Sequence, residues 1–116
     1  MTQHDELIRI RHMRDHALEA IQMLGDSTLD ELRNDRKLQL ALVQLIQIVG
    51  EAASRIDDDL RDAHPAIPWQ LAADMRNKLI HGYDVIEYGI VYDTVKDDLP
   101  MIVRQLNTIL GEPSSS

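Results

Sequence analysis

The sequence has no cysteine and no phenylalanine, and its 116 residues include only one tryptophan and three tyrosines. Without cysteine the chain can form no disulfide bond, use no thiol nucleophile and bind no metal ion through sulfur. So few aromatic side chains argue against a protein that stacks nucleic-acid bases on aromatic surfaces. The core must therefore consist of Leu, Ile, Val, Met and Ala, and this composition favours helices over sheets.

Long apolar runs and an excess of positive charge are also absent. The longest apolar run is the four residues Leu40–Val43, so we expect no membrane-spanning helix. The charged N-terminus lacks the apolar segment of a signal peptide, and we therefore expect a cytoplasmic protein. The chain has 12 basic and 20 acidic residues, a formal net charge of −8. This balance argues against a polybasic protein that binds nucleic acid or a membrane surface.

The spacing of apolar residues predicts helices along nearly the whole chain. The first helix carries an apolar stripe at helical spacing and ends at Gly25, a residue typical of helix ends. That stripe consists of Leu7, Ile10, Ala17, Ile21 and Leu24. Thr28 and Glu31 have the spacing of a capping box and predict a short second helix.

A long third helix is expected next, capped by Asn34 or Asp35. Its apolar stripe extends to Leu60, and the acidic run Asp57–Asp59 and the segment after it are expected to end the helix. Small residues around Gly50 would let another helix approach closely.

The second half of the chain is divided by prolines. Pro65 and Pro68 predict a stiff, non-helical connector. A further helix is expected from Trp69, which we interpret as a core anchor, to a stop at Gly82. Its last turn places Asn77 and His81 four residues apart, on one face of the helix.

A last long helix is expected to begin with a second capping box formed by Asp84 and Glu87. Pro100 lies inside this helix and should kink or split it. No sequence signal indicates a β-hairpin. Together these signals predict an all-α, four- to five-helix up-and-down bundle, with residues 1–111 as one domain and 112–116 as a disordered tail.

Two histidines, His12 and His16, lie one turn apart on the first helix, with His4 and Asp5 upstream. Such a pair could hold a metal ion, but no third ligand has suitable spacing. We therefore interpret His12 and His16 as partly exposed helix residues, and predict no metal and no cofactor.

Three arginines, Arg9, Arg11 and Arg14, also lie on the first helix. They could guide RNA, but Glu6 and Asp15 are interspersed among them. A solvated face of mixed charge is the interpretation that we favour.

The richest polar cluster is the segment RNKLIHGY, residues 76–83. An imidazole such as that of His81 can move protons at neutral pH, a guanidinium such as that of Arg76 can grip a phosphate, and the Asn77 amide can orient either group. The structural alternative is an ion pair of Arg76 with Asp74 or Asp84, with His81 closing a helix C-terminus.

This segment resembles the Arg-x4-His-x-Tyr motif of HepT-like proteins, a branch of the HEPN superfamily. Three further segments resemble that family in the same order: IVGEAASRI (48–56), HPAIPW (64–69) and YDTVKDDLP (92–100). The resemblance covers most of the chain, roughly from Ile8 to Leu110.

The resemblance implies a HEPN-type bundle that forms a homodimer, with two copies of the motif facing each other across a cleft. It also implies a metal-independent endoribonuclease that acts as the toxin of a two-gene toxin–antitoxin system. The antitoxin would be a nucleotidyltransferase of the MNT type, which in some members attaches AMP to the motif tyrosine. Arg76, His81 and Tyr83 match the motif, and Asn77 follows its arginine.

In this interpretation His81 is the general base and acid of a 2′-OH transesterification, Arg76 stabilises phosphoryl charge and Asn77 orients the phosphate or the imidazole. Lys78 is a weaker candidate that would add positive charge to the cleft. Glu51 is another, for the site or the dimer interface, although solvent exposure or an ion pair with its i+4 neighbour is favoured. The alternatives are a non-catalytic module that binds a nucleotide or a nucleotidyltransferase partner, and a plain helical scaffold.

Overall fold

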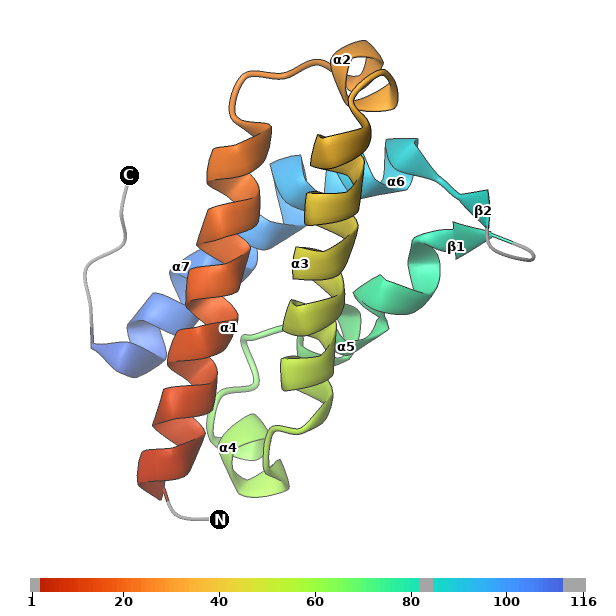
Figure 1. The fold of residues 1–116 in the computed structure, drawn as a ribbon. Helices are drawn as coiled ribbons and strands as arrows, with labels where there is room; N and C mark the ends of the chain where they lie inside the picture. The colour runs from red at the N-terminus through yellow and green to blue at the C-terminus, as the bar shows by residue number, and fades with distance from the viewer. Residues whose placement is uncertain (1–2, 82–84, 112–116) are drawn as a thin grey trace.

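The structure is a computed structural model that describes residues 3–81 and 85–111, with side chains for 5–79 and 85–111 (Figure 1). Helices dominate it, so the all-α prediction is confirmed. The elements in chain order are α1 (Gln3–Leu24), α2 (Leu29–Arg33), α3 (Arg36–Ser54), α4 (Asp58–Ala63), α5 (Trp69–Lys78), β1 (Ile80–His81), β2 (Val85–Ile86), α6 (Tyr88–Asp93), the π-helix η1 (Thr94–Asp98) and α7 (Leu99–Leu110).

Helices α1 and α3 run antiparallel along the length of the molecule (Figure 1). Helix α1 also packs on α7, and α3 also packs on α5. The apolar faces of these four helices meet in one core of aliphatic and small residues. Among its fully buried members are Ile10, Met13, Leu42, Ile46, Met75, Leu79, Leu99, Ile102 and Leu106.

Local capping signals fix the start of the second and third helices as the sequence predicts. The Thr28 hydroxyl accepts a hydrogen bond from the Glu31 amide at 3.1 Å, and the Glu31 carboxylate accepts one from the Thr28 amide at 3.0 Å. Of the two candidate caps for α3, the structure selects Asp35, whose carboxylate accepts a bond from the Leu38 amide at 3.1 Å. These bonds satisfy amides that a helix start would otherwise leave unpaired.

The long third helix is shorter than predicted, because α3 ends at Ser54. The acidic run begins the separate helix α4 instead of ending α3, with Asp57 as its N-cap. Carboxylates are favourable at a helix N-terminus, where the macrodipole is positive. Arg61 of α4 donates a hydrogen bond to the Ala53 carbonyl at 2.8 Å and so satisfies the C-terminal end of α3.

The helix after the prolines starts as predicted but ends early. Helix α5 begins at Trp69, which is 6% exposed and donates its indole N–H to the His64 carbonyl at 3.1 Å. It ends at Lys78, and His81 lies in β1, so the prediction that Asn77 and His81 share a helix face is wrong.

A two-residue antiparallel strand pair, which no sequence signal predicted, follows α5. Ile80 pairs with Ile86, His81 pairs with Val85, and the Glu87 amide donates to the Leu79 carbonyl at 2.9 Å. So short a ladder shows no alternation of apolar and polar residues.

Helix α6 begins at Tyr88 with Glu87 as its N-cap, so the predicted capping box starting at position 84 is wrong. Position 84 itself lies outside the described residues. The split predicted at Pro100 is confirmed: the π-helix η1 precedes α7, and the Leu99 amide donates to the Thr94 carbonyl five residues back. Proline has no backbone N–H to donate to the hydrogen bonds of a regular helix. The wider π-helical turn before Pro100 accommodates the missing bond.

The first helix is less solvated than its charge pattern suggests. Arg14 is 9% exposed and donates a hydrogen bond at 3.0 Å to the side chain of Asn107, which is 3% exposed, on α7. Glu6 is 5% exposed. The interpretation of a solvated face is therefore wrong for these two residues. Within the described ranges, none of the helices is long and apolar enough to cross a membrane.

Helices α3 and α5 approach each other closely at Gly50. A Cβ atom at this position would lie 3.3 Å from the Ala72 carbonyl oxygen and 3.5 Å from the Cβ of Arg76. Gly50 therefore permits the backbone contact that sets the position of Arg76.

A bulky side chain at Gly50 is expected to separate α3 from α5. The variant Gly50→Leu should lose about 1–3 kcal/mol of unfolding free energy, as overpacked sites do, measured by urea denaturation. The matched control is Gly89→Leu on α6, where the nearest described atom is 4.0 Å away in the flexible Arg33 side chain. Equal stabilities of the two variants would contradict the close approach.

Candidate functional site

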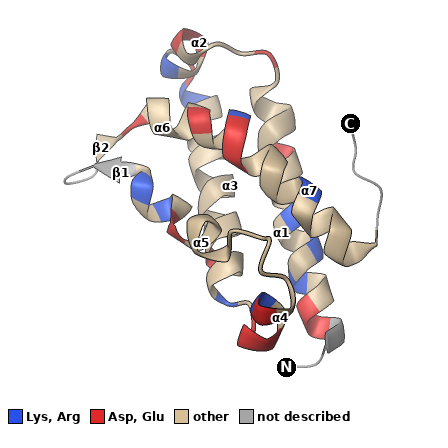
Figure 2. Cartoon of the chain, turned by 180° about the vertical axis from the view of Figure 1, so that it is seen from behind, with Lys and Arg blue, Asp and Glu red and all other residues tan. Residues whose placement is uncertain are grey.

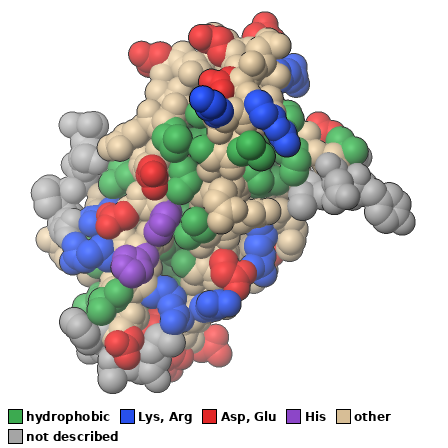
Figure 3. Space-filling view, in the orientation of Figure 1, with side chains coloured by type: hydrophobic (Ala, Val, Ile, Leu, Met, Phe, Trp, Pro, Cys, Tyr) green, Lys and Arg blue, Asp and Glu red, His purple; other side chains and the backbone are tan. Residues whose placement is uncertain are grey.

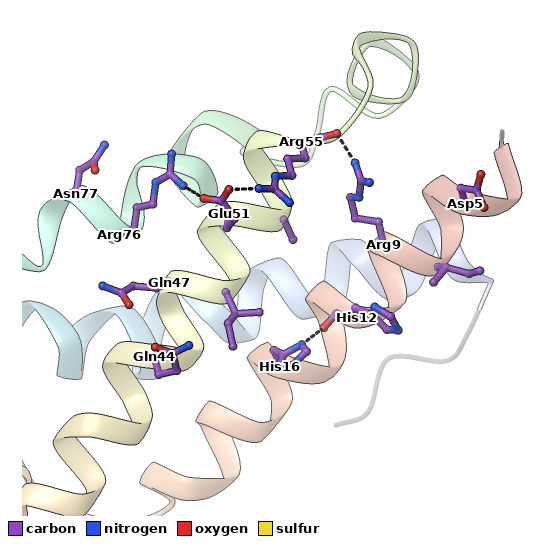
Figure 4. Close-up of a pocket in the computed structure, with 13 residues that line it drawn as sticks. Asp5, Arg9, His12, His16, Gln44, Gln47, Glu51, Arg55, Arg76 and Asn77 are labelled. Atoms are coloured by element: carbon purple, nitrogen blue, oxygen red, sulfur yellow. Dashed lines mark hydrogen bonds and ion pairs between the residues drawn. The ribbon is translucent and has the colours of Figure 1, made fainter. Parts of the chain in front are cut away.

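A pocket of about 760 Å³ lies between α1, α3 and α5 (Figure 4). Its polar lining is rich in groups that bind anions. Three arginines, Arg9, Arg55 and Arg76, line it together with two carboxylates, those of Asp5 and Glu51. Cationic side chains thus outnumber anionic ones here, in a chain whose formal net charge is −8.

Glu51 joins two of these arginines (Figure 4). One carboxylate oxygen, Oε1, lies 2.8 Å from Nη2 of Arg55, and the other, Oε2, accepts a hydrogen bond from Nη1 of Arg76. The predicted ion pair of Glu51 with Arg55 is therefore confirmed, and a second one is added to it. Because a carboxylate has two oxygens, Glu51 of α3 orients two guanidinium groups, that of Arg76 on α5 and that of Arg55 at the end of α3.

Arg76 lies in the last turn of α5 and is not paired with Asp74, one of the partners considered for it. Asp74 instead accepts a hydrogen bond from Gln70 at 2.9 Å. The other candidate, Asp84, lies outside the described residues. Arg76 keeps 36% of its side chain exposed, so its remaining N–H groups can reach a ligand in the pocket.

The structure describes only part of the segment that follows Arg76. Asn77 lines the pocket beside Arg76 and is exposed. His81 has its backbone in β1, three residues beyond the end of α5, but its side chain is not among those described. Tyr83 lies outside the described residues. The structure thus brings Arg76, Asn77 and Glu51 together, and it does not test the predicted positions of the His81 and Tyr83 side chains.

Lys78 is not among the described residues that line the pocket. Its positive charge instead acts on Asp98, which lies directly before α7. Burial raises the pKa of the Asp98 carboxyl, and the nearby carboxylates of Asp93 and Asp97 raise it further. The charge of Lys78 works against these effects and lowers the same pKa.

Charge is distributed unevenly over the chain. Figure 2 shows acidic residues at α4 and α2 and basic residues at the C-terminal end of α5. Arg76 and Lys78 are the basic residues of that last turn, whereas the first turn of α4 holds Asp58 and Asp59. The basic end of α5 adjoins the pocket.

The α1 side of the pocket was not predicted from the sequence. Arg9, His12 and His16 line it together with Asp5 and Ile8. Their spacing of three and four residues was the available signal, because it places all of them on one face of a helix. Among the side chains described, those of residues 5–79 and 85–111, no group of three His, Cys, Asp or Glu is placed to hold a metal ion.

The fold and the site define a helical bundle in which an Arg-x4-His-x-Tyr motif begins in the last turn of α5, beside a pocket lined by three arginines. The family profile described as "Ribonuclease HepT-like" matches residues 13–109. The chain belongs to this HepT-like ribonuclease family.

Individual relatives agree with the family match. A Thermococcus cleftensis protein named "Probable ribonuclease HepT" is 36% identical over 72% of this chain and 80% of its own length. Two Methanocaldococcus jannaschii proteins with names of the form "Putative RNase" are also similar. One is 33% identical over 79% of this chain and 76% of its own, and the other is 28% identical over 94% and 100%. No solved structure matches the chain.

The raised pKa of Asp98 predicts a pH-dependent stability. The folded state binds a proton at this carboxyl more tightly than the unfolded state, whose pKa is near the ordinary 3.8. The ionised carboxyl therefore costs stability at neutral pH, and this cost disappears as the pH falls through the raised pKa. We expect Asp98→Asn to be more stable than wild type at pH 7, with the difference shrinking towards pH 4.

Thermal unfolding at several pH values measures this difference. Asp26→Asn, an exposed site in the turn after α1, serves as the control. A stabilising effect of Asp98→Asn that stays constant with pH would contradict the assignment.

Proposed function

We propose that the protein is a metal-independent endoribonuclease that cleaves RNA by attack of the ribose 2′-OH. The observation that carries the proposal is the placement of the motif arginine, Arg76, which is oriented by Glu51 in a pocket that is also lined by Arg9 and Arg55. Membership of the HepT-like ribonuclease family supports the same chemistry.

In the proposed reaction His81 removes the proton of the 2′-OH, and the 2′-oxygen forms a bond to phosphorus. The bond between phosphorus and the 5′-oxygen breaks, and that oxygen receives a proton from a histidine acting as general acid. Arg76 stabilises the charge on the non-bridging oxygens, and Asn77 orients the phosphate. The products are a 2′,3′-cyclic phosphate and a 5′-OH end, and DNA is not cleaved because it lacks the nucleophile.

The active form in this proposal is a homodimer in which two motifs face one cleft. One argument for it is electrostatic, because a chain with a net charge of −8 repels RNA except where basic residues gather. Bringing the basic end of α5 from two copies together would double the local positive charge. Each cleft would then hold two copies of Arg76 and two of His81.

The proposed biological role is that of a toxin in the cytoplasm, neutralised by an MNT-type nucleotidyltransferase. Transfer of AMP to Tyr83 would add bulk and negative charge to the proposed cleft and block access of RNA. The support for this role is the complete motif, which retains the tyrosine at the second position after the histidine.

Cleavage of a mixed RNA substrate in EDTA tests the activity. Wild type should release ends that carry 2′,3′-cyclic phosphates. Loss of the histidine in His81→Ala should reduce the rate by about 10²–10⁴-fold, and loss of the guanidinium in Arg76→Ala by about 10²–10³-fold.

The control is His64→Ala, which removes a histidine outside the described lining of the pocket. Equal rates for wild type and His81→Ala would refute the mechanism. RNA binding by wild type without cleavage would favour the non-catalytic binding module, provided that its intact mass shows no added AMP.

Modification of Tyr83 is tested by incubating the protein with an MNT-type nucleotidyltransferase and ATP. We expect the intact mass to increase by one or more AMP units and cleavage to cease. The variant Tyr83→Phe lacks the acceptor hydroxyl and should keep its mass. An unchanged mass of wild type would contradict this part of the proposal.

A further inference from the structure

The two histidines of α1 line the same pocket as the motif arginine but have no role in the proposed cleavage step. His12 is exposed and His16 is half-buried, and both border the pocket beside Arg9 (Figure 4). Figure 3 shows histidine side chains next to each other on this face of the molecule, with basic side chains close by.

A hydrogen bond fixes how the His16 ring can interact. Its Nδ1 lies 2.7 Å from the carbonyl oxygen of His12. A carbonyl oxygen only accepts hydrogen bonds, so Nδ1 carries the hydrogen. The other nitrogen, Nε2, then accepts a bond from a ligand when the ring is neutral, or donates one to a phosphate when it is protonated.

Polar contacts connect Arg9, on the same side of the pocket as this pair, to the motif arginine. Arg9, one turn before His12, donates a hydrogen bond at 2.7 Å to the backbone carbonyl of Arg55. The Arg55 guanidinium contacts Glu51, which also holds Arg76. Cationic side chains, joined in part through Glu51, therefore extend from α5 over the end of α3 to α1 (Figure 4).

The rest of the lining suits the base and sugar of a nucleotide. Ile48 and Ala52 of α3 and Ile8 of α1 provide apolar surface, and Ile8 is 41% exposed. Gln44 and Gln47 add amides, which can both donate to and accept from a base edge. A volume of about 760 Å³ lies within the range of small-ligand pockets, about 300–1,000 Å³.

We infer that the α1 side of the pocket binds a nucleotide of the RNA strand that flanks the scissile phosphate. Arg9 and Arg55 contact its phosphate, and His12 and His16 contact the next phosphate along the strand. The inference rests on the proposed ribonuclease function for the position of the scissile bond. It assigns RNA binding to residues of α1, which lie outside the Arg-x4-His-x-Tyr motif.

Binding of an uncleavable strand tests the inference without relying on catalysis. The probe is a fluorescent 2′-O-methyl oligoribonucleotide, which cannot react, and its anisotropy reports the dissociation constant. We expect His12→Ala/His16→Ala to bind about tenfold more weakly than wild type, because hydrogen bonds to charged groups contribute that much. His64→Ala, outside the described lining, should bind as wild type does.

The double variant should fold, because both histidines are at least partly exposed and alanine favours a helix. A second variant, Arg9→Gln, tests the phosphate contact separately. It should lower the magnitude of the slope of log K against log salt by about 0.7, as expected for one lost phosphate contact to a single strand.

A comparison of cleavage rates on a short and a long substrate distinguishes failure of the inference from failure of the proposed function. A dinucleoside monophosphate contains only the scissile phosphate, whereas a longer RNA also reaches the α1 side. The double variant should therefore lose about tenfold more kcat/KM on the long strand than on the dinucleotide. If wild type cleaves neither substrate, the proposed function fails, and the anisotropy measurement still tests the pocket.

Two results would overturn the inference: equal affinity of wild type and the double variant for the oligonucleotide, or no binding by wild type. If the equal affinity is accompanied by a changed dimer dissociation constant in sedimentation, this face is instead a contact between two copies of the chain.

Discussion

The contact between α3 and α5 at Gly50 is the constraint on which the arrangement of the site depends. Helix α3 packs on α1 along one face and on α5 along another, so it holds both sides of the pocket. At Gly50 the two backbones come close enough that even a Cβ atom would lie 3.3 Å from a carbonyl oxygen of α5. The next residue, Glu51, then meets Arg76 directly, and the packing of the helices thus determines the ion pair.

The ion pairs of Glu51 orient side chains more than they stabilise the fold. The Glu51 side chain is 45% exposed and that of Arg55 is 66% exposed. Pairs with this exposure contribute about 0–1 kcal/mol, because water screens the charges and the long side chains lose conformational entropy. On a phosphate bound as proposed, a larger effect is expected, since a guanidinium held in one direction would present its donors without a further entropic cost.

The sequence predicted those parts of the fold that local chemistry decides. Thr28, Asp35 and Pro100 act through their own backbone or nearest neighbours, and the structure confirms the role assigned to each. The end of α3 was predicted wrongly because it depends on contacts between helices. Arg61 satisfies the last turn from outside, and the apolar spacing of the sequence simply continues through the break. The strand pair was missed because two residues cannot show a pattern.

For the site, too, the sequence predicted the residues of a contiguous motif but not those that helix packing brings to it. Arg76 and Asn77 were identified from a contiguous motif, and both line the pocket. Arg9, His12 and His16 lie at least 60 positions earlier, and only the packing of α1 against α3 brings them to the motif. A periodicity argument could place these three on one face of α1. It could not show that this face borders the pocket, because the sequence alone does not define the rotation of one helix against another.

The acidic character of the chain is compatible with an anionic ligand when distance is considered. At physiological ionic strength the charge of an exposed carboxylate is screened over about 8 Å. The acidic turn of α4 and the acidic residues of α2 therefore act mainly on their own surroundings, whereas Arg9, Arg55 and Arg76 converge within one pocket. A ligand in that pocket would meet the three guanidinium groups and the carboxylates of Asp5 and Glu51 at short range, so the local excess of positive charge is expected to matter more for binding than the net charge of −8.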